Sequence, residues 1–207
     1  MVKTLFISPH NDDEALFGSF IIQQELPEVW VVLDGITQRA EGKTNCTSEA
    51  RRQESIAAVE ILLGINYKSH QSIQFFGDQD YDPDWNRVSR LMESLSKQGF
   101  STVYAPYPEP HPSHHKQHNQ IGILATKVFP HSLLFYTTYT RYHGKTGTST
   151  PNAREWKPTD GLQIQKKLLA LACYKSQMDV MGCREHFMRD LREYVVEYRP
   201  GEMWWEK

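Results

Sequence analysis

The sequence predicts an α/β fold in which a mostly parallel central sheet carries helices on both faces. Short apolar segments alternate along the chain with longer segments of helical periodicity, which is the pattern of successive strand–helix units. Residues 29–33 are continuously apolar, as is typical of a strand buried on both faces of a parallel sheet. The 207 residues suit one domain, and we expect a single domain that spans 1–207.

Short apolar or β-branched segments that run into turn-forming residues mark the expected strands. Asp34-Gly35 ends one of these segments, and Pro106 ends another. The strands are expected at 2–8, 29–33, 72–76, 101–105 and 132–139.

Apolar residues at helical spacing, together with end signals, mark the helices between these strands. Pro27 ends the first helix, whereas Ser48 caps the clearest one and Gly64 stops it. We expect the segment 141–160, which contains Gly, Thr and Pro, to be a loop. The helices are expected at 14–26, 48–63, 86–98, 114–129, 162–175 and 185–194.

The composition disfavours some classes of partner and location. The net charge is -2 with histidine neutral, so no basic excess attracts a nucleic-acid backbone. The three cysteines are scattered without a CxxC pair, which favours a reducing compartment. The first apolar segment is too short for a signal peptide, and no segment has the length of a membrane span. We therefore expect a soluble, cytoplasmic protein without a nucleic-acid partner.

Two stretches rich in metal-ligating residues follow predicted strands. The first is PHNDDE at 9–14, and the second is HPSHHKQH at 111–118, which holds four of the nine histidines. Ligand sites of parallel sheets lie at the carboxyl ends of the strands, so we expect both stretches to form one site. Neutral imidazole and carboxylate groups are zinc ligands, and two histidines with one carboxylate leave a position open for catalysis.

These stretches resemble the PIG-L/LmbE-like family of zinc-dependent N-acetylglucosamine deacetylases. Its members include the deacetylases of mycothiol and bacillithiol synthesis and of GlcNAc-phosphatidylinositol. The likeness rests on SPHNDDEAL at 8–16 and on HPSH at 111–114. Weaker matches follow in the family's order at Asp34-Gly35, at Arg51-x-x-Glu54 and from Lys167 to Ser176-Gln177. The resemblance implies a Rossmann-like three-layer sandwich and a hydrolase that removes the acetyl group from an N-acetylglucosamine-type sugar or glycoconjugate.

The resemblance also assigns roles to individual residues. It implies that His10, Asp13 and His114 bind one zinc ion per chain. Asp12 matches the general base that takes a proton from the metal-activated water. His111 matches the histidine that stabilises the oxyanion or protonates the leaving amine.

Substrate contacts are predicted at Arg51, Asp34 and Asp80, which lie in the weaker matches or directly after a predicted strand. His115 and His118 are expected at the surface or behind the ligands.

One departure from the family pattern concerns the catalytic histidine. Ser113 stands where an aspartate is usual, and that carboxylate would orient a histidine and favour its charged form. Glu109, two residues before His111, is the alternative partner.

Three other interpretations remain open. The acidic residues of the first stretch could only cap the following helix, whose N-terminus favours negative charge. The Ser113 departure leaves room for a catalytically weakened sugar- or metal-binding member of the same fold. A metal-dependent phosphatase or nuclease would use the acidic cluster with magnesium, which the histidine-rich ligand set opposes.

Overall fold

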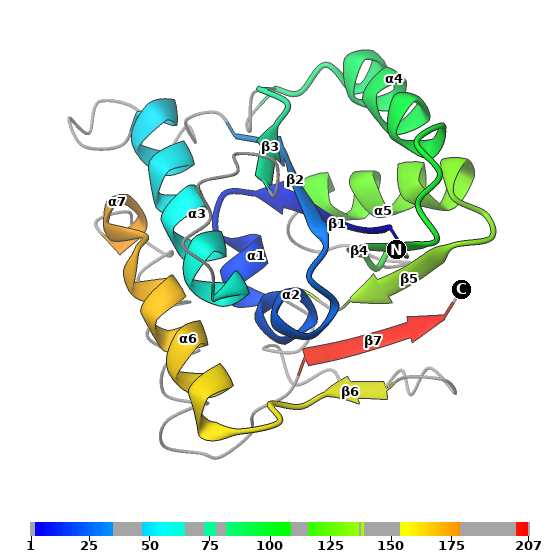
Figure 1. The fold of residues 1–207 in the computed structure, drawn as a ribbon. Helices are drawn as coiled ribbons and strands as arrows, with labels where there is room; N and C mark the ends of the chain where they lie inside the picture. The colour runs from blue at the N-terminus through cyan, green and yellow to red at the C-terminus, as the bar shows by residue number, and fades with distance from the viewer. Residues whose placement is uncertain are drawn as a thin grey trace.

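Seven strands of the described residues form one sheet, in the order β3-β2-β1-β4-β5-β7-β6 (Figure 1). The computed structural model describes residues 3–34, 47–64, 73–77, 82–108, 116–136, 138, 154–178 and 202–206, with side chains for all of these except 154, 155, 178 and 202–206. The expected helix at 185–194 lies outside these residues.

Five neighbouring strands are parallel, and they lie where the sequence predicts strands. They are β1 (Thr4–His10), β2 (Glu28–Leu33), β3 (Ile73–Phe75), β4 (Thr102–Pro106) and β5 (Leu133–Tyr136). The predicted α/β class with a mostly parallel sheet is therefore confirmed.

Two short strands extend the sheet through antiparallel pairs. β7 (Glu202–Glu206) pairs with β5 and with β6 (Arg154–Trp156). The expectation that all of 141–160 is loop is therefore wrong at β6. A strand of three residues gives little periodicity, and among the described residues β6 pairs with β7, almost fifty positions further along the chain.

Seven helices surround the sheet in the described part of the chain. They are α1 (Asp13–Leu16), α2 (Ser19–Glu25), α3 (Ser48–Leu63), α4 (Trp85–Ser96), α5 (Lys116–Val128), α6 (Gly161–Ala172) and α7 (Lys175–Met178). Their bounds agree with the expected helices to within two residues, except in two places. The first expected helix is two helices separated at Gly18, and the helix expected at 162–175 ends at Ala172, before the short α7. A Cβ on Gly18 would lie 2.3 Å from the Phe6 ring, so only glycine lets the chain pass this close to β1.

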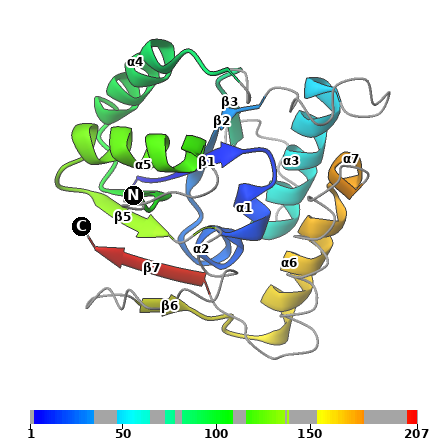
Figure 2. The same cartoon turned by 180° about the vertical axis from the view of Figure 1, so that it is seen from behind.

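The helices form a layer on each face of the sheet, as Figures 1 and 2 show from opposite sides. Side chains of β1 alternate between two hydrophobic clusters: Phe6 packs with residues of α1, α2, α3 and α6, whereas Leu5 and Ile7 pack with residues of α4 and α5. This alternation buries both faces of β1 and fixes where its last residue points. The three-layer arrangement is the one that the resemblance implies.

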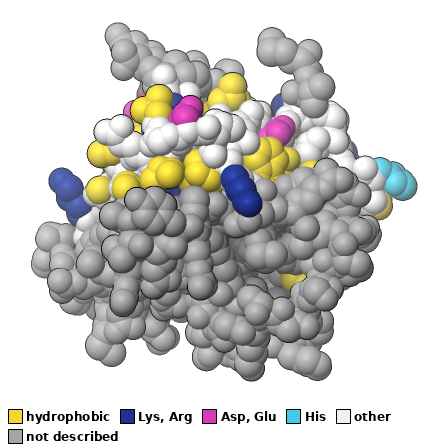
Figure 3. Space-filling view, turned by 90° about the horizontal axis from the view of Figure 1, so that it is seen from below, with side chains coloured by type: hydrophobic (Ala, Val, Ile, Leu, Met, Phe, Trp, Pro, Cys, Tyr) yellow, Lys and Arg dark blue, Asp and Glu magenta, His cyan; other side chains and the backbone are white. Residues whose placement is uncertain are grey.

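The surface carries some exposed hydrophobic side chains. Seen from below, they form a band across part of the described face (Figure 3). The large hydrophobic residues exposed in the described part of the chain are Leu26, Leu162 and Leu169. No helix among the described residues has the length and apolar character needed to cross a membrane.

Candidate metal centre

The chain reverses its course along the sheet between β1 and β4. It runs from β1 to β2 and β3 on one side, and from β4 to β5 on the other. Ligands of open α/β sheets bind where the strand order reverses, at the carboxyl ends of the strands. His10 is the last residue of β1, and α5, which follows β4, carries His118.

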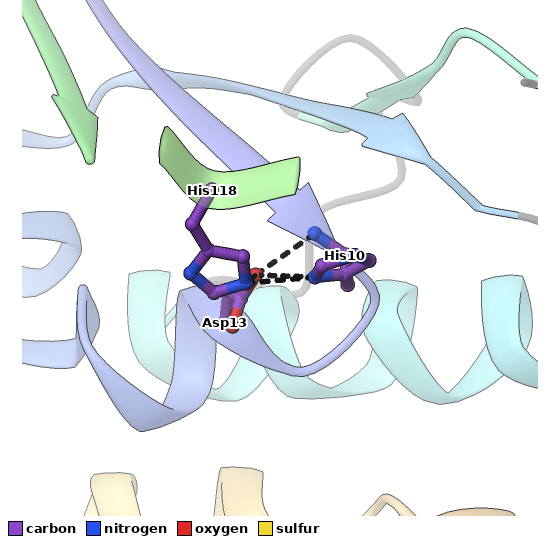
Figure 4. A group of neighbouring side chains, drawn as sticks. All are labelled: His10, Asp13 and His118. Atoms are coloured by element: carbon purple, nitrogen blue, oxygen red, sulfur yellow. Dashed lines mark hydrogen bonds and ion pairs between the residues drawn. The ribbon is translucent and has the colours of Figure 1, made fainter. Parts of the chain in front are cut away.

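Three side chains from these two connections converge at this point (Figure 4). Nδ1 of His10 lies 2.8 Å from Nε2 of His118 and 3.2 Å from Oδ2 of Asp13. Nε2 of His118 lies 3.1 Å from the same carboxylate oxygen. One ligand atom from each residue lies within 4.8 Å of the others, so the group can hold a metal ion.

The carboxylate of Asp13 is held ionised inside the protein. The residue is fully buried, and burial by itself raises the pKa of its carboxyl group. The charges and hydrogen bonds of His118 and His10 oppose that effect and bring the pKa well below its usual range. Oδ1 of Asp13 accepts no hydrogen bond from the described residues. A buried anionic oxygen of this kind fits a cation.

Gly122 lets α5 approach the end of β4. A Cβ at this position would lie 2.3 Å from the carbonyl oxygen of Pro106 and 3.0 Å from the nitrogen of Pro108. His118 and Gly122 are four residues apart and so lie on the same face of the helix. The close contact at Gly122 therefore places His118 against the carboxyl end of the sheet.

Gly122→Ala is expected to weaken both the fold and the metal centre. The added methyl group must push α5 away from β4, and overpacking of this kind costs about 1–3 kcal/mol. Because α5 carries His118, we expect lower zinc affinity together with a lower midpoint of thermal unfolding. Gly161→Ala is the matched control, since a Cβ there meets nothing within 4 Å. Equal zinc affinity in the two variants would contradict this role of Gly122.

Asp12, the residue before Asp13, has an unusual backbone conformation. Its φ is 122° and its ψ is -29°, which an L-residue rarely adopts. Burial and the neighbouring Asp13 raise the pKa of its carboxyl group well above the ordinary value, although Arg51 and His10 act in the opposite direction. A carboxyl group with a raised pKa is a better proton acceptor than an ordinary aspartate.

The sequence of residues 5–129 matches the family model described as PIG-L: GlcNAc-PI de-N-acetylase. This match spans more than half of the chain and includes all three residues of the cluster. The chain belongs to the PIG-L family. It is therefore a hydrolase of the deacetylase class. No curated protein matches the sequence.

Solved structures with the fold of this PIG-L protein carry the names of more than one kind of enzyme. The zinc-inhibited form of teicoplanin deacetylase Orf2 is 19% identical, with a TM-score of 0.67 over 98% of this chain and 97% of that chain. N,N'-diacetylchitobiose deacetylase from Pyrococcus horikoshii is 22% identical, with a TM-score of 0.68 over 98% and 82%. The 4-carboxy-2-hydroxymuconate hydratase GalB from Pseudomonas putida is 17% identical, with a TM-score of 0.61 over 99% and 95%. These likenesses establish the fold.

The weaker family matches late in the sequence, from Lys167 to Ser176, make contacts with α1 and α3. Lys167 on α6 is fully buried, and its Nζ donates a hydrogen bond of 2.8 Å to the carbonyl of Leu16 at the end of α1. The Ser176 hydroxyl and backbone N–H donate to the Glu54 carboxylate on α3. Lys167 thus contacts the helix that carries Asp13, whereas Ser176 joins α7 to α3.

Two of the predicted substrate contacts have partners within the protein. Arg51 is 1% exposed, and its Nη2 donates a hydrogen bond of 3.1 Å to the carbonyl of Asn11. Asp34, just beyond the end of β2, is fully buried and forms an ion pair with Arg52. Their contact with substrate stays a prediction. The predicted site residues Asp80, His111 and His114, together with Ser113 and Glu109, lie outside the described residues.

His118 is the member of the cluster that sequence reasoning missed. We expected it at the surface or behind the ligands, whereas it is 2% exposed and directed at His10 and Asp13. The signal was the spacing: His-x-x-His occurs both at 111–114 and at 115–118. Only the second pair ends four residues before Gly122. Gly122 is the residue that allows α5 to lie close to the end of β4.

Proposed function

We propose that this protein is a zinc-dependent N-deacetylase that acts on an N-acetylglucosamine-type sugar or glycoconjugate. The observation that carries the proposal is the buried group of His10, Asp13 and His118 at the carboxyl edge of the sheet, in a chain of the PIG-L family. We propose these three residues as the metal ligands. His114, which the sequence resemblance favoured, is the alternative to His118.

The donor set fits zinc. Zinc takes imidazole nitrogen and carboxylate oxygen, and three protein ligands with one open position are typical of catalytic sites. Ligand atoms bound at about 2.0–2.1 Å around a tetrahedral zinc ion lie about 3.3 Å apart. The ligand atoms of His10, Asp13 and His118 lie 2.8, 3.1 and 3.2 Å apart, which supports one ion bound among them.

The protein's own groups supply the proton transfers. When bound, zinc would act as a Lewis acid and would lower the pKa of a bound water to about 7. Asp12 accepts the proton of the attacking water in this proposal, because its carboxyl group neighbours Asp13 and has a raised pKa.

The leaving amine needs a proton because an unprotonated amide nitrogen leaves poorly. The sequence resemblance assigns this role, or that of oxyanion stabilisation, to His111. If the second His-x-x-His pair is the functional one, His115 takes the place of His111. Both histidines lie outside the described residues, so the choice between them is a matter for mutagenesis.

The names of the structural neighbours support an acetamido sugar as substrate. Orf2 is named a teicoplanin deacetylase, and the Pyrococcus enzyme a deacetylase of N,N'-diacetylchitobiose. GalB is named a hydratase on the same fold, so the fold does not decide the reaction. The family match and the His–Asp–His cluster favour the deacetylase.

Zinc-loaded protein is expected to release acetate from at least one acetamido sugar. The panel should include N-acetylglucosamine, N,N'-diacetylchitobiose and an N-acetylglucosamine-bearing glycopeptide, with free acetate and free amine both measured. Removal of metal by a chelator should abolish release, and one equivalent of zinc should restore it. Excess zinc is avoided because a zinc-inhibited form of Orf2 exists.

The same assay discriminates the alternatives. Tight sugar binding without acetate release would indicate the weakened, binding-only member of the fold. Release of phosphate from p-nitrophenyl phosphate in magnesium, without deacetylation, would indicate the phosphatase. Either result would contradict the proposed function.

A further inference from the structure

The backbone of Asp12 needs support from its surroundings. A non-glycine residue in a sparsely populated conformation costs about 1–3 kcal/mol and persists only where neighbouring groups hold it. The carbonyl of Asp12 accepts from the N–H groups of Ala15 and Leu16, at 2.9 Å each, as the start of α1. These two bonds hold the carbonyl of Asp12. Its φ angle also depends on what holds its N–H group.

Glu14 holds that N–H group. Its Oε2 accepts from the backbone N–H of Asp12 at 3.2 Å and from the hydroxyl of Ser8 at 2.9 Å. Ser8 belongs to β1, so Glu14 ties the turn that carries Asp12 to the strand before it. Glu14 is fully buried, and nothing in the proposed mechanism uses its carboxylate.

The other oxygen of Glu14 faces Tyr174. The Tyr174 hydroxyl donates to Oε1 of Glu14 and lies 3.4 Å from Oγ of Ser55 on α3. Ser55 in turn accepts a hydrogen bond of 3.0 Å from the side-chain amide of Asn11, the residue before Asp12. Tyr174 is therefore linked to Asp12 through Glu14 and to Asn11 through Ser55.

Tyr174 is itself placed by the contact between α7 and α3. It lies between α6 and α7, and it is fully buried in the hydrophobic cluster on that face of the sheet. Two residues later, the backbone N–H and hydroxyl of Ser176 donate to Glu54 at 2.7 and 2.6 Å. This double contact fixes the start of α7 on α3 and, with it, the position of the Tyr174 ring.

We propose that Tyr174 is a positioning residue: through Glu14, its hydroxyl holds Asp12 in the conformation that turns the chain from His10 to Asp13. The effect on the conformation of the turn is independent of the reaction. The effect on turnover rests on the proposed deacetylase function and on Asp12 as its base.

The conformational effect is tested in metal-free protein by amide hydrogen exchange. Tyr174→Phe keeps the ring in the core and removes only the hydroxyl. The Asp12 amide should then exchange at least about tenfold faster, because Glu14 is no longer held by Tyr174 in the position from which it accepts the Asp12 N–H. An unchanged exchange rate at Asp12 would overturn the proposal, whatever the activity.

Tyr136→Phe is the matched control. Tyr136 is also fully buried, and its hydroxyl donates a hydrogen bond of 2.8 Å to the carbonyl of Ile7, not to Glu14. Both variants lose one buried hydroxyl and keep the ring. Faster Asp12 exchange in both to the same extent would mean that Tyr174 acts only through general stability, which would overturn a specific role.

A double-mutant cycle tests whether the effect passes through Glu14. Tyr174 and the Asp12 N–H bind different oxygens of Glu14. Glu14→Gln replaces one of these oxygens with an NH2 group, which cannot accept a hydrogen bond, so the side chain can no longer accept from both. If Tyr174 acts through Glu14, adding Tyr174→Phe to Glu14→Gln should change Asp12 exchange by less than about threefold. Multiplicative effects of the two changes would overturn the proposed route.

Turnover supplies the catalytic readout. With an active substrate, Tyr174→Phe should lower kcat about 10–100-fold, as loss of a residue that orients a functional group does, while KM and zinc content stay unchanged. A loss of Asp12 protection with normal kcat would overturn the catalytic part. If wild-type protein releases no acetate from any substrate, the proposed function fails, and the exchange result decides on the positioning role alone.

Discussion

Asp12→Asn is expected to lower kcat by ~10²–10⁴-fold while the zinc content stays at one equivalent, since that factor is the usual worth of a positioned general base. Asparagine has nearly the same shape as aspartate but cannot accept the proton of the attacking water. The backbone contacts of residue 12 do not involve the carboxylate, because the carbonyl and the N–H make them. The turn should therefore keep its conformation. The measurements are acetate release under saturating substrate and zinc by elemental analysis.

Asp160→Asn controls for the chemical change itself. Asp160 caps α6 by accepting the N–H of Gln163 at 2.9 Å, and asparagine is an equally good cap. This control should keep both stability and turnover. Near-normal kcat in zinc-loaded Asp12→Asn would remove Asp12 from the proposed proton transfer.

His118→Ala is expected to have the largest effect on metal binding. Loss of a residue that only supports a ligand costs about 10–100-fold in affinity, so loss of a ligand should cost more than that. The structure places Nε2 of His118 3.1 Å from Oδ2 of Asp13, at the centre of the cluster. Purified His118→Ala should therefore hold little zinc and release little acetate, measured by elemental analysis and by acetate release from the acetamido-sugar panel.

His114→Ala decides between the two possible ligand sets. If His118 is the ligand, His114→Ala should retain its zinc, as should the control His131→Ala, which changes an exposed histidine. A full equivalent of zinc in His118→Ala, together with loss of zinc in His114→Ala, would restore the ligand set that the sequence resemblance favoured.

Most of the layered fold could be predicted because its signals are local. The continuous apolar run of β2 indicates a strand buried on both faces, and the cap and stop signals of α3 lie within one segment. The expected cap is wrong by one residue: Thr47, and not Ser48, caps α3 by accepting the N–H of Ala50 at 3.0 Å. Gly64 ends the helix with a φ of 71°, as the sequence predicts. Such end signals act through contacts between residues a few positions apart, so the sequence is sufficient to show them.

The antiparallel edge of the sheet could not be predicted in this way. β6 is three residues long, and its register comes from pairing Glu155 with Met203. The break between α1 and α2 also depends on a distant residue, because the Phe6 ring occupies the space beside Gly18. In both cases the deciding contact joins segments that are separated in the sequence.

By itself, the sequence determined the fold class, the family, and the stretch that supplies His10, Asp12 and Asp13 to the site. Those residues are adjacent in the chain, so one turn after β1 delivers them together. The sequence did not decide which of the clustered histidines completes the group. That choice depends on the distance between α5 and β4, which Gly122 and the backbone at Pro106 set. Only tertiary structure brings His118 to His10, because a ligand group is defined by distances between atoms and not by separation along the chain.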